Sequence, residues 1–326
     1  MRVEDWLRTN TFHHPDFRDL EKLVELKKKQ NLKISLGLPT LNEADTIATE
    51  ILVLSDELVD NFPLLDEIAV IDSGSTDDTC RIARDHGALV YQASECLEEH
   101  GVHRGKGESL WKSIYLLNGD IIIWIDADIK NIHPKFVYGL VGPLLADPGI
   151  GYVKAFYDRP LSGETRLRPT GGGRVSEIMM RPVMNLFFPE LSGFIQPLSG
   201  EYAGRREIFE QVQFDIGYGV EICLLIDILE KFGLNMMAQV DLDKRVHKNK
   251  QMPALTQMSF GILHAFFDKL EELGKIKIAE EVNHTLQTFK RKEHNYLPSV
   301  FEYSSAKRPP MAEIPEYRKK RELWEK

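Results

Sequence analysis

The sequence predicts an α/β fold built on a doubly wound, mostly parallel sheet, with a helical extension at its C-terminus. Strand-like apolar segments alternate with helical segments between residues 33 and 145, the pattern of parallel strands joined by helices. The five residues Ile121 to Ile125 are all large and apolar, so this strand is expected at the centre of the sheet, covered on both sides. Two carboxylates, Asp126 and Asp128, follow it directly.

The other elements follow from local patterns. A charged helical arm is expected over residues 1–30, and the remaining strands are expected at 33–38, 67–71, 88–91, 151–157 and 237–242. Helices are expected at 43–62, with Asn42 as the N-cap, and at 78–86, 105–117 and 133–145. From residue 253 the pattern is helical again, and a further helix is expected at 276–290.

Length and composition indicate a soluble globular protein. The 326 residues are 43% hydrophobic and 28% charged, and no apolar run approaches the roughly 18 residues that span a bilayer. The net charge of -9 argues against nucleic acid as the main partner, although local basic clusters can still bind acidic small molecules. Three widely spaced cysteines and an N-terminus without a signal-peptide pattern predict a cytoplasmic protein.

Polar, turn-forming clusters follow three predicted strands, at residues 39–43, 72–77 and 126–128. Ligands of doubly wound sheets bind beyond the carboxyl ends of the strands, so these clusters should line one crevice. Side chains alternate along an extended chain, so Asp126 and Asp128 should point the same way and suit Mg²⁺ or Mn²⁺. A solvated Asp-rich turn has the same spacing. No Gly-x-Gly-x-x-Gly follows the first strand, which argues against a dinucleotide-dependent dehydrogenase.

Two glycine-rich segments are candidates for phosphate binding. Lys106 lies between two glycines at a helix start, and Arg174 follows three glycines ahead of an apolar helical run. A solvated lysine and a glycine hinge with a surface arginine are the alternatives. In the late segment 245–249, Arg245, His247 and Asn249 would share one side of an extended chain, or lie in a solvated basic loop. Segments 200–205 and 217–221 look like turn-to-helix junctions whose chemistry the spacing leaves open.

Six motifs taken together resemble the glucosyl-3-phosphoglycerate synthases, a family of retaining GT-A glycosyltransferases that includes mannosyl-3-phosphoglycerate-forming members. The resemblance covers residues 34–250 and rests on segments 39–43, 72–77, 105–108, 126–128, 172–176 and 245–249, in the family's order. Ser176 stands where members often have Thr, and Ala127 where Ser is common. The resemblance implies a catalytic domain over 31–250, with a nucleotide-sugar half at 31–130 and an acceptor half at 131–250, and a helical extension over 251–326.

The resemblance also implies a role for each matching residue. The metal ligands would be Asp128 and His247. The donor would be held by Pro39, Leu41, Glu43, Asp72, Ser73, Lys106, Asp126, Ala127 and Arg245. The acceptor would be held by Gly173, Arg174, Ser176 and Asn249. Catalytic roles would fall to Asp128, Lys106, Arg245 and Glu201, the last as an orienting group.

The implied activity is transfer of glucose from UDP- or GDP-glucose to the 2-hydroxyl of 3-phosphoglycerate, with retention and with Mg²⁺ or Mn²⁺. Such an enzyme would work as a homodimer in the synthesis of glucosylglycerate, a compatible solute, without a nucleic acid or membrane partner. A mannosyltransferase for the same acceptor is the same-class alternative, because motifs do not expose the contacts that select a sugar. A non-catalytic nucleotide-sugar binding protein and a membrane-linked polyprenyl phosphate transferase are alternatives of other kinds. The chain keeps both the metal and acceptor motifs and has no hydrophobic anchor, which argues against these two.

Overall fold

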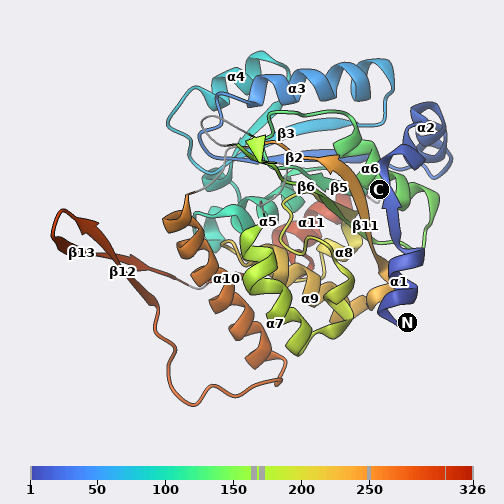
Figure 1. Cartoon of the computed structure of the whole chain (residues 1–326). Coiled ribbons are helices and arrows are strands. Elements are labelled where there is room, and N and C mark those ends of the chain that lie inside the picture. Colours follow the sequence, from blue (N-terminus) through green and yellow to red (C-terminus); the bar gives the residue numbers. More distant parts are fainter. Residues whose placement is uncertain (1, 163–166, 169–172, 248–250, 305, 325–326) are drawn as a thin grey trace.

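A central sheet of eight strands organises the protein (Figure 1). The computed structural model describes residues 2–162, 167–168, 173–247, 251–304 and 306–324. Across the sheet the strands are β1 (Thr11–His13), β11 (Met237–Lys244), β6 (Tyr152–Asp158), β9 (Tyr202–Arg205), β5 (Ile121–Trp124), β2 (Ile34–Thr40), β3 (Glu67–Asp72) and β4 (Leu89–Gln92). All neighbours are parallel except β9, which is antiparallel to both β5 and β6. The predicted doubly wound, mostly parallel sheet is confirmed.

Helices cover both faces of this sheet. They are α1 (Val3–Thr9), α2 (Leu20–Lys29), α3 (Ile47–Ser55), α4 (Thr79–Asp85), α5 (Lys106–Leu116), α6 (Lys135–Ala146), α7 (Arg181–Phe187), α8 (Arg206–Phe209), α9 (Val220–Phe232), α10 (Met252–Glu272) and α11 (Pro315–Trp324). The small antiparallel pairs within the described ranges are β7 (Leu161–Ser162) with β8 (Leu167–Arg168), β10 (Phe214–Asp215) with β14 (Lys307–Arg308), and β12 (Thr285–Lys292) with β13 (Asn295–Glu302). Among the described residues, no helix is long and apolar enough to cross a membrane.

Strand β5 explains why helices lie on both faces. Ile121 and Ile123 belong to the core cluster under α2, α3 and α6, whereas Ile122 and Trp124 belong to the cluster under α5, α9 and α10. All four side chains are fully buried. Because side chains alternate along a strand, only a run that is apolar at every position can fill both layers.

Two strands of the sheet escaped prediction. Segment 200–205 is not a turn-to-helix junction, because residues 202–205 form β9 between β5 and β6. Strand β1 joins the edge of the sheet beside β11, anchored by Trp6, whose indole Nε1 donates to the Met237 carbonyl at 2.8 Å. Neither β1 nor β9 stands out as an apolar run or an alternating pattern in the sequence, and their pairing across the sheet decides them.

Two helix predictions were wrong in their bounds or type. Helix α3 begins at Ile47, and Asn42 is not its N-cap: Asn42 has φ 58° and accepts a 2.8 Å hydrogen bond from the Thr76 amide, which ties two loops together. The helix expected at 276–290 is wrong as well, because residues 285–302 form the β12–β13 hairpin, which projects from the body (Figure 1). Hydrogen bonds between the two strands pair the backbone N–H and C=O groups that would pair within a helix.

Candidate active site

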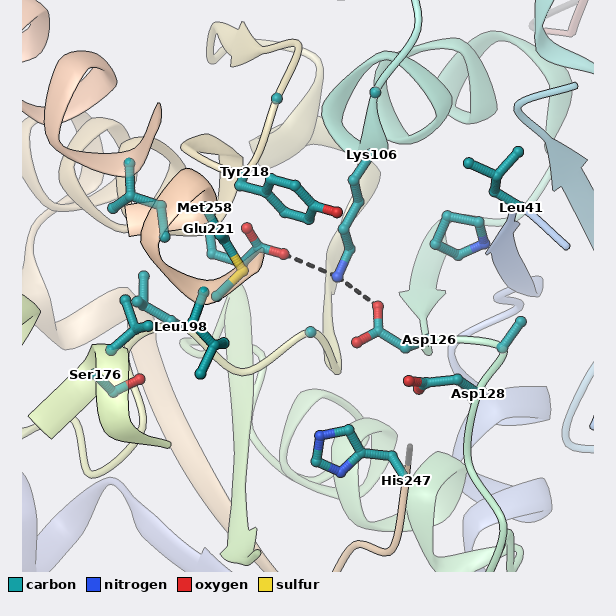
Figure 2. Close-up of a pocket in the computed structure, with 18 of the residues that line it drawn as sticks. Leu41, Lys106, Asp126, Asp128, Ser176, Leu198, Tyr218, Glu221, His247 and Met258 are labelled. Carbon is teal, nitrogen blue, oxygen red and sulfur yellow. Dashed lines mark hydrogen bonds and ion pairs between the residues drawn. The ribbon is translucent and has the colours of Figure 1, made fainter. Parts of the chain in front are cut away.

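A cavity of about 540 Å³ lies where the polar clusters after β2, β3 and β5 meet the segment after β11. The predicted residues that line it are Pro39, Leu41, Glu43, Ser73, Lys106, Asp126, Ala127, Asp128, Gly173, Arg174, Ser176, Arg245 and His247. Figure 2 shows Lys106, Asp126, Asp128 and His247 around one space, with Ser176 and Leu198 across it. Convergence at the carboxyl ends of parallel strands is the geometry that the sheet topology requires.

Arg245 joins the two carboxylates that follow β5. Its Nη2 lies 2.7 Å from Asp128 Oδ1 and 3.0 Å from Asp126 Oδ2, so both acids point toward one cation. Burial acts to raise the pKa of Asp126, but the charges of Lys106 and Arg245 outweigh it and hold that pKa well below its usual range. Asp126 is therefore ionised and lies in contact with two cations, Lys106 and Arg245.

Lys106 projects from the first turn of α5 into the same cluster. Its Nζ lies 2.5 Å from Asp126 Oδ1 and 2.8 Å from Glu221 Oε1 (Figure 2). Burial opposes the charge on Lys106, but the two carboxylates raise its pKa above the usual value. Glu221 lies at the start of α9 and lines the cavity with Tyr218, and spacing alone did not reveal either as a site residue. An acid two residues after a Gly-Tyr-Gly turn, at a helix start, was the available signal.

The glycines beside Lys106 serve packing. A Cβ at Gly105 would lie 2.1 Å from the Ile216 carbonyl oxygen, and one at Gly107 would lie 1.7 Å from that of Asp215. Both positions let the start of α5 rest directly on the backbone of β10 and the residue after it. These glycines therefore have a structural role, and Gly105 also lines the cavity beside Lys106, so phosphate binding at this segment stays a prediction.

His247 reaches the acid pair through backbone pairing. An isolated bridge joins Ile129 and His247, and the Lys130 amide donates to the Val246 carbonyl at 2.8 Å. Figure 2 shows the imidazole and the Asp128 carboxylate facing the same space. A carboxylate and an imidazole fit a divalent ion such as Mn²⁺ or Mg²⁺, with the nitrogen favouring Mn²⁺. The donor set present in this chain therefore fits the metal that the resemblance implies.

Glu50 supports the acidic turn from beneath and was missed by sequence reasoning. It lies on α3, is fully buried, and its Oε1 accepts a 2.7 Å hydrogen bond from the Ile129 amide. Burial raises its pKa well above the usual value, and the charge of Asp128 raises it further. A carboxyl group on the apolar face of a helix was the signal that could have identified it.

Two predicted residues build the site without lining the cavity in the described part of the chain. Glu201 is fully buried, and its Oε1 lies 2.9 Å from Arg245 Nε, while its other oxygen accepts from the Tyr157 hydroxyl. Asp72 accepts 2.9 Å hydrogen bonds from the amides of Gly74 and Ser75. Glu201, expected as an orienting group, contacts Arg245, and Asp72 shapes the loop after β3, while a donor contact of Asp72 stays a prediction.

Three of the predicted acceptor residues line the same cavity, and Figure 2 shows Ser176 across it from the acid pair. Gly173 has φ 76°, which glycine adopts without strain, and Arg174 and Ser176 follow it on the cavity wall. Arg174 Nη1 lies 3.3 Å from Met252 Sδ at the start of α10. Asn249 lies outside the described residues. Arg104 and Arg159 add two cations to the lining that no motif had identified.

Comparisons with known proteins agree with this geometry. The glycosyl transferase family 2 model matches residues 35–213. A glucosyl-3-phosphoglycerate synthase from Petrotoga mobilis is 53% identical over 318 residues, 98% of each chain. The structure of glucosyl-3-phosphoglycerate synthase from Mycobacterium tuberculosis with Mn²⁺, UDP and phosphoglyceric acid has a TM-score of 0.81 and 40% identity, covering 93% of this chain and 97% of that one. Mannosyl-3-phosphoglycerate synthase from Rubrobacter xylanophilus has a TM-score of 0.87 and 35% identity, covering 95% and 97%. These neighbours confirm the GT-A fold, and the chain belongs to glycosyl transferase family 2, among the glucosyl-3-phosphoglycerate synthases.

Proposed function

We propose that this protein transfers glucose from UDP-glucose to the 2-hydroxyl of 3-phosphoglycerate with retention at the anomeric carbon. The observation that carries the proposal is the cavity itself, which is lined by Asp128, His247, Lys106 and Arg174. Figure 2 shows Ser176 of the acceptor segment across this space from Asp128 and His247. A metal-diphosphate site and an anion site would thus share a space that two substrates can occupy. The 53% identity to the Petrotoga mobilis synthase supports this choice.

The donor side would hold the nucleotide sugar by its diphosphate. Asp128 and His247 would bind Mg²⁺ or Mn²⁺, which when bound neutralises the negative charge that develops on the leaving diphosphate. Lys106 and Arg245 would stabilise the same charge, since both are held as cations by neighbouring carboxylates. Pro39, Leu41, Glu43 and Ser73, with Ala127, would enclose the nucleoside along the ends of β2, β3 and β5.

The acceptor side would hold 3-phosphoglycerate by its anionic groups. Arg174 supplies a guanidinium, Ser176 a hydroxyl and Gly173 a backbone amide on the cavity wall. Asn249 would complete the set from the segment after His247. With the acceptor on the same face as the leaving diphosphate, a diphosphate oxygen can take the proton of the attacking hydroxyl, so no protein nucleophile is needed.

The test is a donor panel. The purified protein is given 3-phosphoglycerate with UDP-glucose, GDP-glucose, UDP-mannose or GDP-mannose and with Mg²⁺ or Mn²⁺, and products are identified by NMR. We expect an α-linked glucosyl product that carries the phosphate, with the metal required. Failure to transfer any sugar to 3-phosphoglycerate, while nucleotide binding persists, would favour a non-catalytic nucleotide-sugar binding protein.

A mannosyl transferase is the second candidate, favoured by the TM-score of 0.87 to the Rubrobacter xylanophilus mannosyl-3-phosphoglycerate synthase. Donor competition separates the two. If GDP-mannose at equal concentration suppresses glucosyl transfer and is itself the preferred donor, the sugar assignment changes while the site remains. Comparable turnover of both donors would indicate a dual-specificity enzyme.

A homodimer is also proposed, with the β12–β13 hairpin as contact. The hairpin pairs only with itself in the described chain, and its side chains Phe289, Tyr296 and Val300 are 62%, 67% and 58% exposed. A lone two-stranded hairpin is marginally stable in water, so a partner chain would stabilise it. Light scattering should give the mass of a dimer, and the double variant Phe289→Ser, Tyr296→Ser should have the mass of a monomer. A monomeric parent at micromolar concentration would refute this contact.

We place the reaction in the cytoplasm, in the synthesis of the compatible solute glucosylglycerate. The three cysteines Cys80, Cys96 and Cys223 are free thiols, consistent with a reducing compartment. Cell fractionation tests the location, and loss of glucosylglycerate in a deletion strain tests the role. A deletion strain that accumulates as much glucosylglycerate as its parent would contradict this role.

A further inference from the structure

The C-terminal segment is built into the support of Lys106, although the two are far apart in sequence. Arg308 of β14 is 5% exposed, and its guanidinium forms a two-pronged ion pair with Glu108 of α5, at 2.6 Å from Nε to Oε2 and 2.6 Å from Nη2 to Oε1. Glu108 is 1% exposed and lies two residues after Lys106. The paired residues are 200 positions apart.

The same guanidinium also holds the loop that precedes α5. Its Nη2 donates to the Gly101 carbonyl at 2.8 Å, and its Nη1 donates to the His100 carbonyl. The group lies over the Trp111 ring, 4.8 Å from the centroid, and Trp111 Nε1 donates to the Pro309 carbonyl at 2.8 Å. Arg308 thus binds the chain on both sides of Gly105 and Lys106.

The partner strand of β14 positions the other half of the Lys106 ion pair. β14 pairs with β10, and Gly107 and Gly105 rest on the backbone of β10 and of the residue after it. In β10, Asp215 Oδ1 accepts from the amides of Gly217 and Gly219, at 2.9 and 3.2 Å, and so shapes the turn that leads into Glu221. One short ladder therefore aligns both Lys106 and Glu221, whose side chains meet at 2.8 Å.

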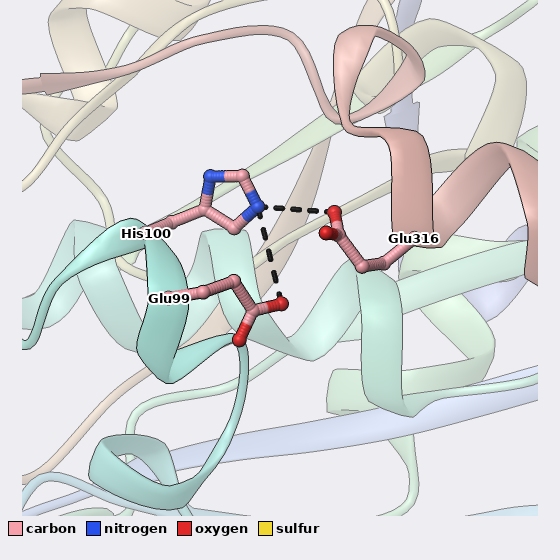
Figure 3. A group of neighbouring side chains, drawn as sticks. All are labelled: Glu99, His100 and Glu316. Atoms are coloured by element: carbon pink, nitrogen blue, oxygen red, sulfur yellow. Dashed lines mark hydrogen bonds and ion pairs between the residues drawn. The ribbon is translucent and has the colours of Figure 1, made fainter.

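A second contact ties the start of α11 to the same loop. His100 Nε2 lies 3.0 Å from Glu316 Oε2 and 4.0 Å from Glu99 Oε1, as Figure 3 shows. His100 and Glu99 belong to the short helical turn 98–100, which leads through Arg104 into Lys106. The C-terminal segment from β14 to α11 therefore contacts the loop before α5 at two places.

We propose that Arg308 is a positioning residue for the donor diphosphate. It touches neither substrate, and it acts by holding the first turn of α5 and the loop 98–104 so that Lys106 points at Asp126 and Glu221. A lysine that is mobile in the free enzyme loses conformational entropy when it binds the diphosphate, and this loss weakens binding. A lysine that is already held in place avoids that loss. The inference rests on the proposed donor role of Lys106, and it predicts a defect in donor binding without a matching defect in acceptor binding.

The test compares Arg308→Lys with Arg206→Lys. Arg206 is a matched control because it is 2% exposed and binds the carbonyls of Ile114, Leu117 and Gly119 and the Tyr317 hydroxyl, at the opposite end of α5. Both variants lose buried hydrogen bonds, so both should melt at a lower temperature. Only Arg308→Lys should also raise the KM for UDP-glucose and weaken Mn²⁺-dependent UDP binding, by about tenfold, the loss expected when the charge-assisted bond from Lys106 to the diphosphate is weakened. The KM for 3-phosphoglycerate should stay at the parent value.

Glu108→Gln offers a second route if Arg308→Lys does not fold, because it keeps the size of the side chain but replaces one of the two oxygens that accept from Arg308 by an NH2 donor. It should show the same selective loss of UDP affinity. If Arg308→Lys and Glu108→Gln bind UDP like the parent, or if Arg206→Lys shows the same donor defect, the positioning role is wrong. A parent protein that binds no UDP would instead overturn the donor site itself, so the two failures are distinct.

Discussion

Arg245 donates a 2.7 Å hydrogen bond from Nη2 to Asp128 Oδ1, across 117 positions of sequence. The carboxylate that we assign to the metal is thus held by a buried guanidinium, which in turn is held by Asp126 and Glu201. The metal ligand and the cation that faces the leaving diphosphate are therefore parts of one charge network. Removing one carboxylate from this network should affect catalysis more than folding, because the remaining carboxylates still pair with Arg245.

Asp128→Ala should abolish turnover and metal-dependent UDP binding while the fold persists. The variant removes a metal ligand, so activity should fall by more than the roughly 10- to 100-fold typical of outer-shell changes. Calorimetry of UDP binding with and without Mn²⁺ checks the metal, and circular dichroism checks the fold. Asp147→Ala, an exposed acid outside the lining, is the control. Unchanged metal dependence in Asp128→Ala would remove Asp128 from the metal site.

Arg174→Ala should raise the KM for 3-phosphoglycerate far more than the KM for the donor. Loss of a charge-assisted bond to an anion is worth about 1.5 to 3 kcal/mol, or a roughly tenfold to hundredfold rise. Arg181→Ala is the matched control, because Arg181 lies on α7, pairs with Glu177 at 2.8 Å and is not among the described lining residues. Equal damage to both substrates in Arg174→Ala would take Arg174 out of the acceptor site.

His247→Ala should weaken activation by Mn²⁺ more than activation by Mg²⁺. An imidazole nitrogen is a better ligand for Mn²⁺ than for Mg²⁺, which favours oxygen. Activity titrations with each metal measure the effect, and His13→Ala, an exposed histidine on β1, is the control. Parental activation curves for both metals would mean that carboxylate, water and diphosphate hold the ion without His247.

Asp215→Asn should flatten the dependence of stability on pH. Burial raises the pKa of Asp215 from 3.8 to about 6, against the hydrogen bonds from Gly217 and Gly219, which lower it. The folded protein therefore keeps the Asp215 proton where the unfolded chain has lost it. The stability that this proton contributes is complete below about pH 4 and is lost as the pH rises through 6.

The parent should thus lose up to about 3 kcal/mol of unfolding free energy across this window, and the variant should not. Denaturant titrations at pH 4, 5, 6 and 7, with EDTA present, measure the difference. Asp147→Asn, an exposed carboxylate, should follow the parent curve. If Asp215→Asn keeps the full pH slope, the proton on Asp215 does not contribute.

Some parts of the fold and site could be read from local sequence because their causes are local. The apolar run Ile121 to Ile125 can fill two core layers only as a central strand, and acids that follow such a strand must lie at the ligand-binding edge. Strand β9, by contrast, depends on its register with β5 and β6, and the hairpin β12–β13 depends on pairing between its two strands. Local periodicity does not contain that information.

The sequence by itself determined six of the eight strands of the central sheet, the acid pair and the identity of the cations Lys106, Arg174 and Arg245, because side-chain alternation and residue chemistry follow from order along the chain. Only the tertiary structure decided which groups meet. It placed Glu201 behind Arg245, Glu50 beneath the acidic turn and Glu221 against Lys106, and it joined Arg308 to Glu108. The physical reason is that buried charges must find partners, and the partners within reach are set by how distant segments pack.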